Sequence, residues 1–367
     1  ERAHLLTRKA IRELMGWQRP TGEIFSPIPG WYEQELPCQM LASVGYYGFW
    51  TYYMLTGDRQ TIEDVYDGVH RYLYDVWDTD GGAMVRVRRG GWFWGDWGTN
   101  IDKEALQNCW YALALRGMEQ MSALTGRRTE AMYARQLQTV MASTFNNRFW
   151  RGDHYATKSY KDEPDDRVQA MAVLAGFVPE ERYETLRQFF REHFNASPYM
   201  EKYVLEALCR MGCYDDALER MRTRFYDMVV SADYSTLWEG WQYTGGEGMT
   251  YVSGNGTYNH AWSGGGLTIL SQYIAGIEPL SPRFERFAVS PNLASLQWVE
   301  TIVPTRFGNI AMKAVREGDL LHISLTVPEG TTAEVRTPQG YTRLTCADSA
   351  GAVLTLGAGT YEVVAEP

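Results

Sequence analysis

Two short segments near residue 250 bring one carboxylate, one imidazole and three indoles close together in the sequence. They read Ser235-Thr-Leu-Trp-Glu-Gly-Trp241 and Gly256-Thr-Tyr-Asn-His-Ala-Trp-Ser-Gly-Gly265. An indole offers a flat apolar face to the C–H side of a sugar ring, while carboxylate, amide and imidazole groups hydrogen-bond its hydroxyls or move a proton. The candidate side chains are Trp238, Glu239, Trp241, Asn259, His260 and Trp262. Taken alone, Trp-Glu-Gly-Trp fits a buried aromatic patch around a paired glutamate equally well.

A third segment, Gly91-Trp-Phe-Trp-Gly-Asp-Trp-Gly-Thr-Asn-Ile-Asp102, repeats this mixture of indoles and carboxylates. Its glycines exclude a regular helix, so we expect a loop, and exposed indoles on a loop are typical of a binding surface. We therefore expect Trp94, Asp96 and Trp97 to contact the ligand. Asp102 has a simpler role available as the N-cap of the helix that follows it.

The composition indicates a globular chain with one large and one small domain. Of its 367 residues, 45% are hydrophobic and 22% charged, and the aromatic share of 14% is high. A net charge of −10 and the lack of any Lys/Arg run argue against nucleic acid and anionic membrane as partners, because either needs a basic footprint. No apolar stretch approaches the ~20 residues that cross a bilayer. Because the chain starts at Glu1 with neither an initiator Met nor a signal sequence, we expect it to be processed or cut.

The five cysteines are odd in number and scattered, which is not the pattern of a disulfide framework. Cys209 and Cys213 stand four apart, a spacing that also suits a metal or a strained bridge, but no histidine lies nearby in the sequence. We expect reduced, structural thiols. Since the six histidines are equally dispersed, we expect no metal centre and no metal cofactor.

The first part of the chain, residues 1–280, reads as successive helices. At Thr56-Gly57 and Thr125-Gly126 an amphipathic helix runs into a glycine in the left-handed position, and another helix starts within a few residues. These breaks predict antiparallel helical hairpins. Apolar residues on more than one side of a helix, as in 40–53, predict burial from two directions, which suits the inner helices of a closed α/α toroid. The expected helices span 2–18, 36–56, 60–77, 102–125, 128–148, 166–175, 180–194, 199–211, 214–229 and 258–275.

The long loops between these helices are expected to gather at one end of the toroid and to form the binding pocket. They span 22–35, 79–101, 153–165 and 231–257. The second part of the chain, residues 281–367, changes to alternating apolar and polar residues separated by Gly-containing turns. It predicts a small antiparallel β-sandwich with strands at 286–290, 296–303, 309–316, 320–327, 333–336, 352–356 and 360–365.

Several motifs together resemble glycoside hydrolase family 78, the α-L-rhamnosidases. They are Lys9-Ala-Ile-Arg-Glu-Leu14, Trp17-Gln-Arg-Pro20, Glu35-Leu-Pro37, Gly95-Asp-Trp97, Ser197-Pro-Tyr-Met-Glu-Lys202, Thr236-Leu-Trp-Glu-Gly-Trp241 and Tyr258-Asn-His-Ala-Trp-Ser-Gly-Gly265. The resemblance covers nearly the whole chain. It implies a mainly α fold, an (α/α)6 toroid of the six-hairpin glycosidase type, followed by a C-terminal β-sandwich.

The resemblance also implies an inverting glycosidase without a cofactor. It places the general base at Glu239, which would deprotonate the attacking water, and a sugar-contacting imidazole at His260. Inversion needs a second carboxyl group ~6.5–9.5 Å from the first. The family's general acid lies in a motif rich in Cys-Pro and Asp/Arg/Glu, and this sequence begins downstream of it. We therefore expect the C-terminal catalytic part of a larger enzyme, without the family's N-terminal β domains, with Asp96 or Glu35 as the fallback acid.

The expected partner, from the resemblance, is a terminal α-L-rhamnoside in a glycoside or polysaccharide. Family members often work at or outside the cell envelope, so the resemblance implies a secreted or periplasmic protein; it does not indicate an oligomeric state. Two other functions stay open. A toroidal glycosidase or lyase for uronic-acid sugars needs a basic pocket, for which the loops offer Arg86, Arg88 and Arg89. A sugar-binding module that has lost its acid also fits these residues.

Overall fold

The computed structural model describes residues 3–26, 28, 34–88, 91–98, 100–232, 235–241, 249–251 and 254–367. The chain divides into two compact units. The first comprises Glu1–Tyr53, Asp58–Met211 and Trp238–Tyr258, and the second comprises Met54–Gly57, Gly212–Leu237 and Asn259–Pro367. The predicted domain boundary after residue 280 stays a prediction.

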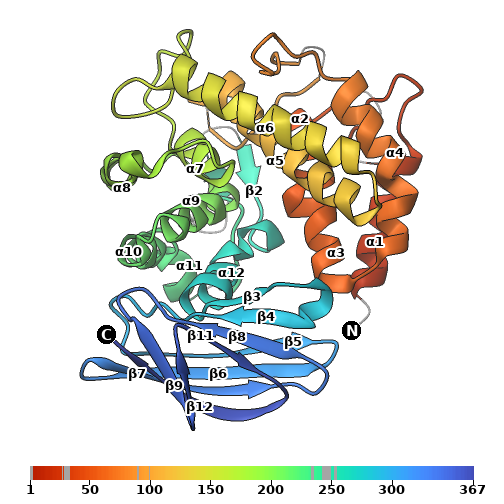
Figure 1. The fold of residues 1–367 in the computed structure, drawn as a ribbon. Helices are drawn as coiled ribbons and strands as arrows, with labels where there is room; N and C mark the ends of the chain where they lie inside the picture. Colours follow the sequence, from red (N-terminus) through yellow and green to blue (C-terminus); the bar gives the residue numbers. More distant parts are fainter. Residues whose placement is uncertain are drawn as a thin grey trace. The chain divides into compact units, whose positions relative to one another are not determined.

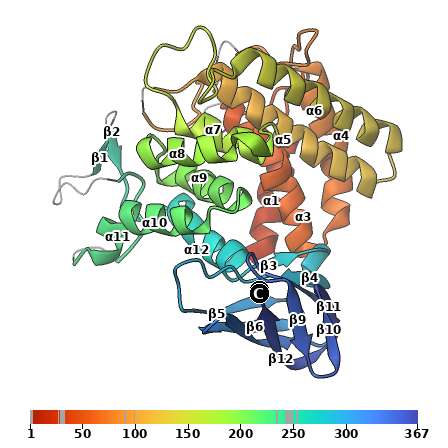
Figure 2. The same cartoon turned by 60° about the vertical axis from the view of Figure 1, so that its left-hand side comes forward.

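Helices build the first unit. They are α1 (Ala3–Gly16), α2 (Pro37–Val44), η1 (Tyr46–Trp50), α3 (Thr51–Thr56, whose residues 54–56 belong to the second unit), α4 (Arg59–Asp75), α5 (Lys103–Leu124), α6 (Arg128–Phe149), α7 (Asp166–Leu174), η2 (Glu180–Arg182), α8 (Tyr183–Glu192) and α9 (Pro198–Arg210). Every residue of α7 is buried, and α5 and α9 are buried on nearly all sides, whereas α6 and α8 bury one stripe only. Inner helices therefore alternate along the chain with outer ones, and α7, α8 and α9 lie together in both views (Figures 1 and 2).

Glycines end these helices as predicted. Gly57 and Gly126 have φ angles of 67° and 80°, a left-handed conformation that costs glycine nothing and other residues about 1 to 2 kcal/mol. The turn at Gly126 folds α6 back along α5, and the two helices lie side by side (Figure 1). The hairpin expected at Thr125-Gly126 is thus confirmed.

The predicted helix 36–56 is interrupted, which the sequence analysis missed. A π-helix, η1, separates α2 from α3. A β-carbon on Gly48 would lie 1.8 Å from the Ser43 carbonyl oxygen, so the local winding admits only glycine there. A β-carbon on Gly117 of α5 would lie 2.5 Å from the carbonyl carbon of Gly45. Backbones therefore touch where η1 crosses α5, and the wider π turn accommodates this approach.

Long loops precede the buried helices α2, α5 and α7, and hydrogen bonds join these loops to one another. The Trp92 N–H donates to Gln34 Oε1 at 3.1 Å, and the Tyr160 hydroxyl donates to the Asn100 carbonyl at 2.8 Å. Asp102 caps α5, since its Oδ1 accepts from the Ala105 N–H, as predicted. The loops at 22–35, 79–101 and 153–165 are therefore connected at the N-terminal ends of the helices that follow them.

The second unit contains the remaining helices and the sandwich. Its helices are α10 (Tyr214–Arg224), α11 (Tyr226–Val230), η3 (Ala261–Gly264), α12 (Gly265–Ile269) and η4 (Leu270–Ile274). Its strands are β3 (Ile277–Pro279), β4 (Arg286–Val289), β5 (Trp298–Thr305), β6 (Gly308–Glu317), β7 (Leu320–Val327), β8 (Thr332–Arg336), β9 (Arg343–Cys346), β10 (Ser349–Gly351), β11 (Val353–Leu356) and β12 (Gly359–Glu366). A short helical turn, η5 (Pro282–Phe284), precedes β4.

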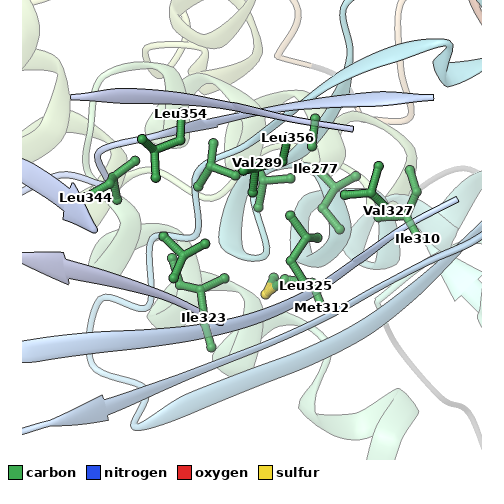
Figure 3. Close-up of a cluster of buried hydrophobic side chains, with 14 of the residues drawn as sticks. Ile277, Val289, Ile310, Met312, Ile323, Leu325, Val327, Leu344, Leu354 and Leu356 are labelled. Atoms are coloured by element: carbon green, nitrogen blue, oxygen red, sulfur yellow. The ribbon is translucent and has the colours of Figure 1, made fainter. Parts of the chain in front are cut away.

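Two sheets pack face to face in the sandwich. Their orders are β10-β9-β12-β7-β6-β5 and β11-β8-β4-β3. Figure 3 shows side chains of both sheets meeting in one core, among them Val289 and Leu354 from the smaller sheet and Met312 and Leu325 from the larger. Strand β7 alternates buried and less buried residues along its length, which is the period-two pattern used to predict it.

Two features of the sandwich were not predicted. Strands β3, β9 and β10 are too short to show a clear alternation of apolar and polar residues, and they were not predicted. Strands β4 and β8 pair in parallel, with Arg286 opposite Thr332, although the other pairs are antiparallel among the described residues. Of the predicted hairpin turns, Glu317-Gly-Asp319 joins the paired strands β6 and β7, whereas the turns after β7, β8 and β11 lead into the other sheet. Turns cannot reveal a parallel pair either, because its strands are distant in sequence. A separate hairpin, β1 (Met249–Tyr251) with β2 (Gly254–Gly256), belongs to the first unit.

The five cysteines are free thiols, and four of them are buried. Among the described residues, no group of three or more His, Cys, Asp or Glu side chains is placed to hold a metal ion. No helix among the same residues has the length and apolar character needed to span a membrane.

Candidate active site

Asp96 lies inside the protein, held by two other segments. Its side chain has no exposed surface. Oδ2 accepts from the Ser197 N–H at 2.9 Å and lies 3.3 Å from Arg167 Nη1, and Oδ1 accepts from the Ser197 hydroxyl. Burial raises the pKa of Asp96, while Arg167 and the Ser197 donors oppose that rise. Both oxygens of Asp96 are thus engaged inside the protein, which does not suit the predicted ligand contact or the fallback role as acid.

Arg167 is the centre of this buried network. Its Nε donates to Asp165 Oδ1 at 2.7 Å, Nη1 donates to the Trp97 carbonyl at 3.0 Å, and Nη2 donates to the Asn100 carbonyl at 2.8 Å. Burial raises the pKa of Asp165 to about 6, against the effect of Arg167. The five donors of a guanidinium suit several acceptors at fixed angles. Arg167 therefore shapes the loop that carries Trp97 and ties it to the start of α7.

Trp241 reaches the same network from the other candidate segment. Its Nε1 donates to the Ala196 carbonyl at 2.8 Å. Ala196 and Ser197 share one peptide group, and the N–H of that group is the donor to Asp96. The loop containing Asp96 and the segment containing Glu239 and Trp241 are consequently connected through the residues that begin α9. The expectation that these two aromatic segments lie in one site stays a prediction.

Glu239 is 7% exposed and lies where hydrogen bonds join two short segments of the chain. Its Oε2 accepts from the Thr257 N–H at 3.1 Å and from Thr257 Oγ1 at 3.3 Å. The Glu239 N–H donates to the Thr257 carbonyl at 2.9 Å. These bonds fix both the backbone and the carboxylate of Glu239, which is the arrangement that a positioned general base requires.

The indoles differ in how much of their surface is available. Trp238 and Trp94 are 1% and 6% exposed. The Trp238 ring meets the Tyr258 ring edge to face at 6.0 Å, and Trp94 packs against Tyr199 at 5.6 Å. Enclosed rings cannot offer a face to a sugar, so the predicted stacking role of Trp94 and Trp238 does not fit their positions. Trp97 and Trp241 are partly exposed and keep that role as a hypothesis.

Glu35 forms a two-point ion pair. Its Oε1 lies 2.7 Å from Arg88 Nε and its Oε2 lies 2.8 Å from Arg88 Nη2. Arg88 Nη1 also donates to the Val76 carbonyl at 2.6 Å. Both carboxylate oxygens lie within ion-pair distance of the Arg88 guanidinium, so Glu35 does not suit the fallback role as general acid. The same pairing neutralises Arg88, which weakens the case for a basic pocket that binds a uronic acid; Arg89 lies outside the described residues.

Asn259, His260 and Trp262 belong to the second compact unit. Asn259 is exposed, and the His260 and Trp262 rings lie 4.1 Å apart between centroids. The His260 N–H donates to the Leu237 carbonyl at 2.9 Å, just before the Glu239 segment. The predicted gathering of His260, Glu239 and Asp96 in one pocket stays a prediction.

Two family models match the chain in succession. The bacterial alpha-L-rhamnosidase 6 hairpin glycosidase domain matches residues 2–274, more than half of the chain, and the bacterial alpha-L-rhamnosidase C-terminal domain matches residues 276–349. The chain belongs to the bacterial α-L-rhamnosidase family. The resemblance drawn from the motifs is therefore confirmed.

Individual rhamnosidases agree with this assignment. An α-L-rhamnosidase of Alteromonas sp. (strain LOR) is 22% identical over 317 residues, which cover 80% of this chain and 34% of that protein. The structure of the α-L-rhamnosidase from Dictyoglumus thermophilum matches with a TM-score of 0.80 at 18% identity, over 98% of this chain and 43% of that one. The Streptomyces avermitilis α-L-rhamnosidase, complexed with L-rhamnose, matches with a TM-score of 0.76 at 18% identity, over 99% of this chain and 36% of that one.

These matches confirm the predicted six-hairpin fold with a β-rich C-terminal region. The rhamnosidase-family chain described here spans about a third of the length of its Alteromonas relative. For the candidate site, sequence reasoning left Arg167 undecided and did not single out Ser197 or Thr257. Their only signal in the sequence was proximity to a singled-out motif: Arg167 follows two aspartates, Ser197 opens Ser197-Pro-Tyr-Met-Glu-Lys202, and Thr257 precedes Tyr258-Asn-His260.

Proposed function

We propose that this chain forms the catalytic barrel of an inverting enzyme that hydrolyses terminal α-L-rhamnosides. The observation that carries the proposal is Glu239, a largely buried carboxylate that Thr257 anchors and that two indoles flank in sequence. Family membership supports glycoside hydrolysis. The rhamnose complex of the Streptomyces avermitilis relative supports L-rhamnose as the recognised sugar.

In the proposed reaction, Glu239 accepts a proton from a water molecule whose oxygen attacks the anomeric carbon on the face opposite the leaving group. A second carboxyl group donates a proton to the leaving oxygen, and the glycosidic C–O bond breaks. The products are the alcohol and L-rhamnose with inverted anomeric configuration. Neither Asp96 nor Glu35 is assigned as the acid, because their oxygens are engaged inside the protein.

The other candidate residues take supporting roles in this proposal. Partly exposed Trp97 and Trp241 line the sugar's apolar side. The family resemblance makes Asn259 and His260 the candidate groups for its hydroxyls. Trp262 packs against the His260 ring and sets its orientation. Asp96 acts indirectly by holding the Trp97 loop and the Ala196–Ser197 peptide in place.

The test is Glu239→Gln in the full-length enzyme. The amide keeps the shape of the side chain but cannot accept the proton, so kcat should fall by several orders of magnitude while the calorimetric affinity for L-rhamnose stays within a few-fold. Glu278→Gln, in the second unit, is the control and should leave kcat unchanged. NMR of the first product should show the β-anomer. A variant that retains more than a tenth of wild-type kcat removes Glu239 from the role of base, and rhamnose binding without any turnover by the wild type would favour a binding module.

A further inference from the structure

We infer that Thr257 is the positioning residue of the general base, an inference that rests on the function proposed for Glu239. Both hydrogen-bond donors of Thr257 end on one carboxylate oxygen, Glu239 Oε2, at 3.1 Å from the backbone nitrogen and 3.3 Å from Oγ1. Glu239 returns a backbone bond to the Thr257 carbonyl at 2.9 Å. One residue therefore holds Glu239 through its main chain and through its side chain at once.

The two kinds of bond have separable effects. Backbone bonds between Glu239 and Thr257, and between His260 and Leu237, pair the two segments without any contribution from the threonine hydroxyl. The hydroxyl adds a second donor to Oε2. Thr257 is itself exposed, so its side chain contributes little to the packed interior. Removal of the hydroxyl should consequently change the carboxylate and leave the fold intact.

A glutamate side chain has three rotatable bonds and therefore many conformations. A general base that deprotonates an attacking water must stay in the one conformation that places its oxygen next to that water. Two donors on one oxygen restrict rotation of the carboxylate about its terminal bond. Misplacement of a catalytic group by about 1 Å can cost on the order of a hundredfold in rate. The cost falls on kcat, because the sugar's binding groups are not moved.

The test compares Thr257→Val, which is close in shape but lacks the hydroxyl, with Thr257→Ser, which restores it. Thr257→Val should lower kcat about 10- to 100-fold with KM within about threefold of wild type and an unchanged unfolding midpoint. Thr257→Ser should recover kcat to within about threefold. Thr223→Val, at an exposed threonine of α10 whose hydroxyl donates to the Glu219 carbonyl, is the matched control and should behave as wild type. Thr257→Ala replaces the valine variant if the latter fails to fold.

Wild-type kcat in Thr257→Val would overturn the inference, as would a serine variant as slow as the valine variant. Glu239→Gln, measured in the same series, separates the two proposals. If Glu239→Gln is inactive and Thr257→Val is fully active, Glu239 is the base and Thr257 does not position it. If Glu239→Gln is itself active, the proposed function fails first.

Discussion

Asp96 and Trp241 bind opposite ends of one peptide group. The N–H between Ala196 and Ser197 donates to Asp96 Oδ2 at 2.9 Å, and the carbonyl of the same group accepts from Trp241 Nε1 at 2.8 Å. Hydrogen bonds arranged in series polarise one another and gain strength. This single peptide therefore couples a buried, Arg167-paired carboxylate to the segment that carries the proposed base.

Ser197→Ala removes a single hydroxyl group, but we expect it to lower the stability of the first unit by more than the loss of one ordinary hydrogen bond would. Ser197 donates to the buried Asp96 and also caps α9, since its Oγ accepts from the Tyr199 N–H at 3.2 Å. Loss of a bond to a buried charged group and of an N-cap together should lower the free energy of unfolding by about 2 to 4 kcal/mol. Urea titration measures the change, with Thr223→Ala as an exposed control. A loss below about 0.5 kcal/mol would show that water replaces the hydroxyl.

Trp238 should matter for stability more than an exposed indole does. Its ring is enclosed, so Trp238→Ala leaves a void and should cost about 3 to 5 kcal/mol of unfolding free energy. Trp92 is 46% exposed, and Trp92→Ala should cost less than about 1 kcal/mol. Thermal unfolding of both variants checks the ranking. Equal melting temperatures would mean that the Trp238 pocket collapses around the alanine.

The backbone contact between η1 and α5 predicts intolerance to a methyl group. In Gly117→Ala the new carbon would start 2.5 Å from the Gly45 carbonyl carbon, so one of the two elements must shift. Overpacking of this kind costs about 1 to 3 kcal/mol. Gly16→Ala is the control, because nothing lies within 4 Å of a β-carbon there and alanine favours helix. Calorimetry should therefore show a lower melting temperature for the first variant only.

Asp58, the N-cap of α4, should contribute stability that depends on pH. Burial raises the pKa of its carboxyl, but hydrogen bonds from Tyr52 and Thr61 and the charge of Arg8 outweigh burial, so the folded pKa lies below the ordinary value. A lowered folded pKa stabilises the fold above the unfolded pKa of about 3.9, and this stabilisation disappears as the pH falls through the folded value.

Asp58→Asn keeps a capping side chain and removes the charge. At pH 7 it should lower the free energy of unfolding by about 1 to 2 kcal/mol. The difference from wild type should stay constant down to about pH 4 and shrink below that. Urea titrations across this range measure it, and a difference that grows on acidification would contradict the assignment.

Local patterns predicted most of the fold. Helix ends followed from Thr-Gly pairs because a glycine in the left-handed conformation ends a helix without tertiary help. Strands β5, β6 and β7 followed from alternation and from turns between neighbours. The interruption of the helix at η1 depends instead on the approach of α5, which lies far along the chain. The parallel pairing of β4 with β8 has the same non-local origin.

The candidate site was predictable in residue type and less so in role. Asp96 stood out because a carboxylate in a loop of indoles has no local partner. Its partners, Arg167 and Ser197, are 71 and 101 residues away, so the sequence could not show that the carboxylate is enclosed. The burial of the Trp238 ring could not be predicted for the same reason, because Tyr258, which packs against that ring, lies in another segment.

The segment between β4 and β8 forms three strands, β5, β6 and β7, of the larger sheet. Because β4 and β8 are parallel, the polypeptide must leave the smaller sheet at Val289, form β5, β6 and β7, and return at Thr332. The meander is local and can form early, whereas the smaller sheet closes only after that whole crossover is in place. Non-local pairing of this kind slows folding. We expect the two sheets to melt as a single cooperative block, with closure of β4 on β8 as the late step of refolding.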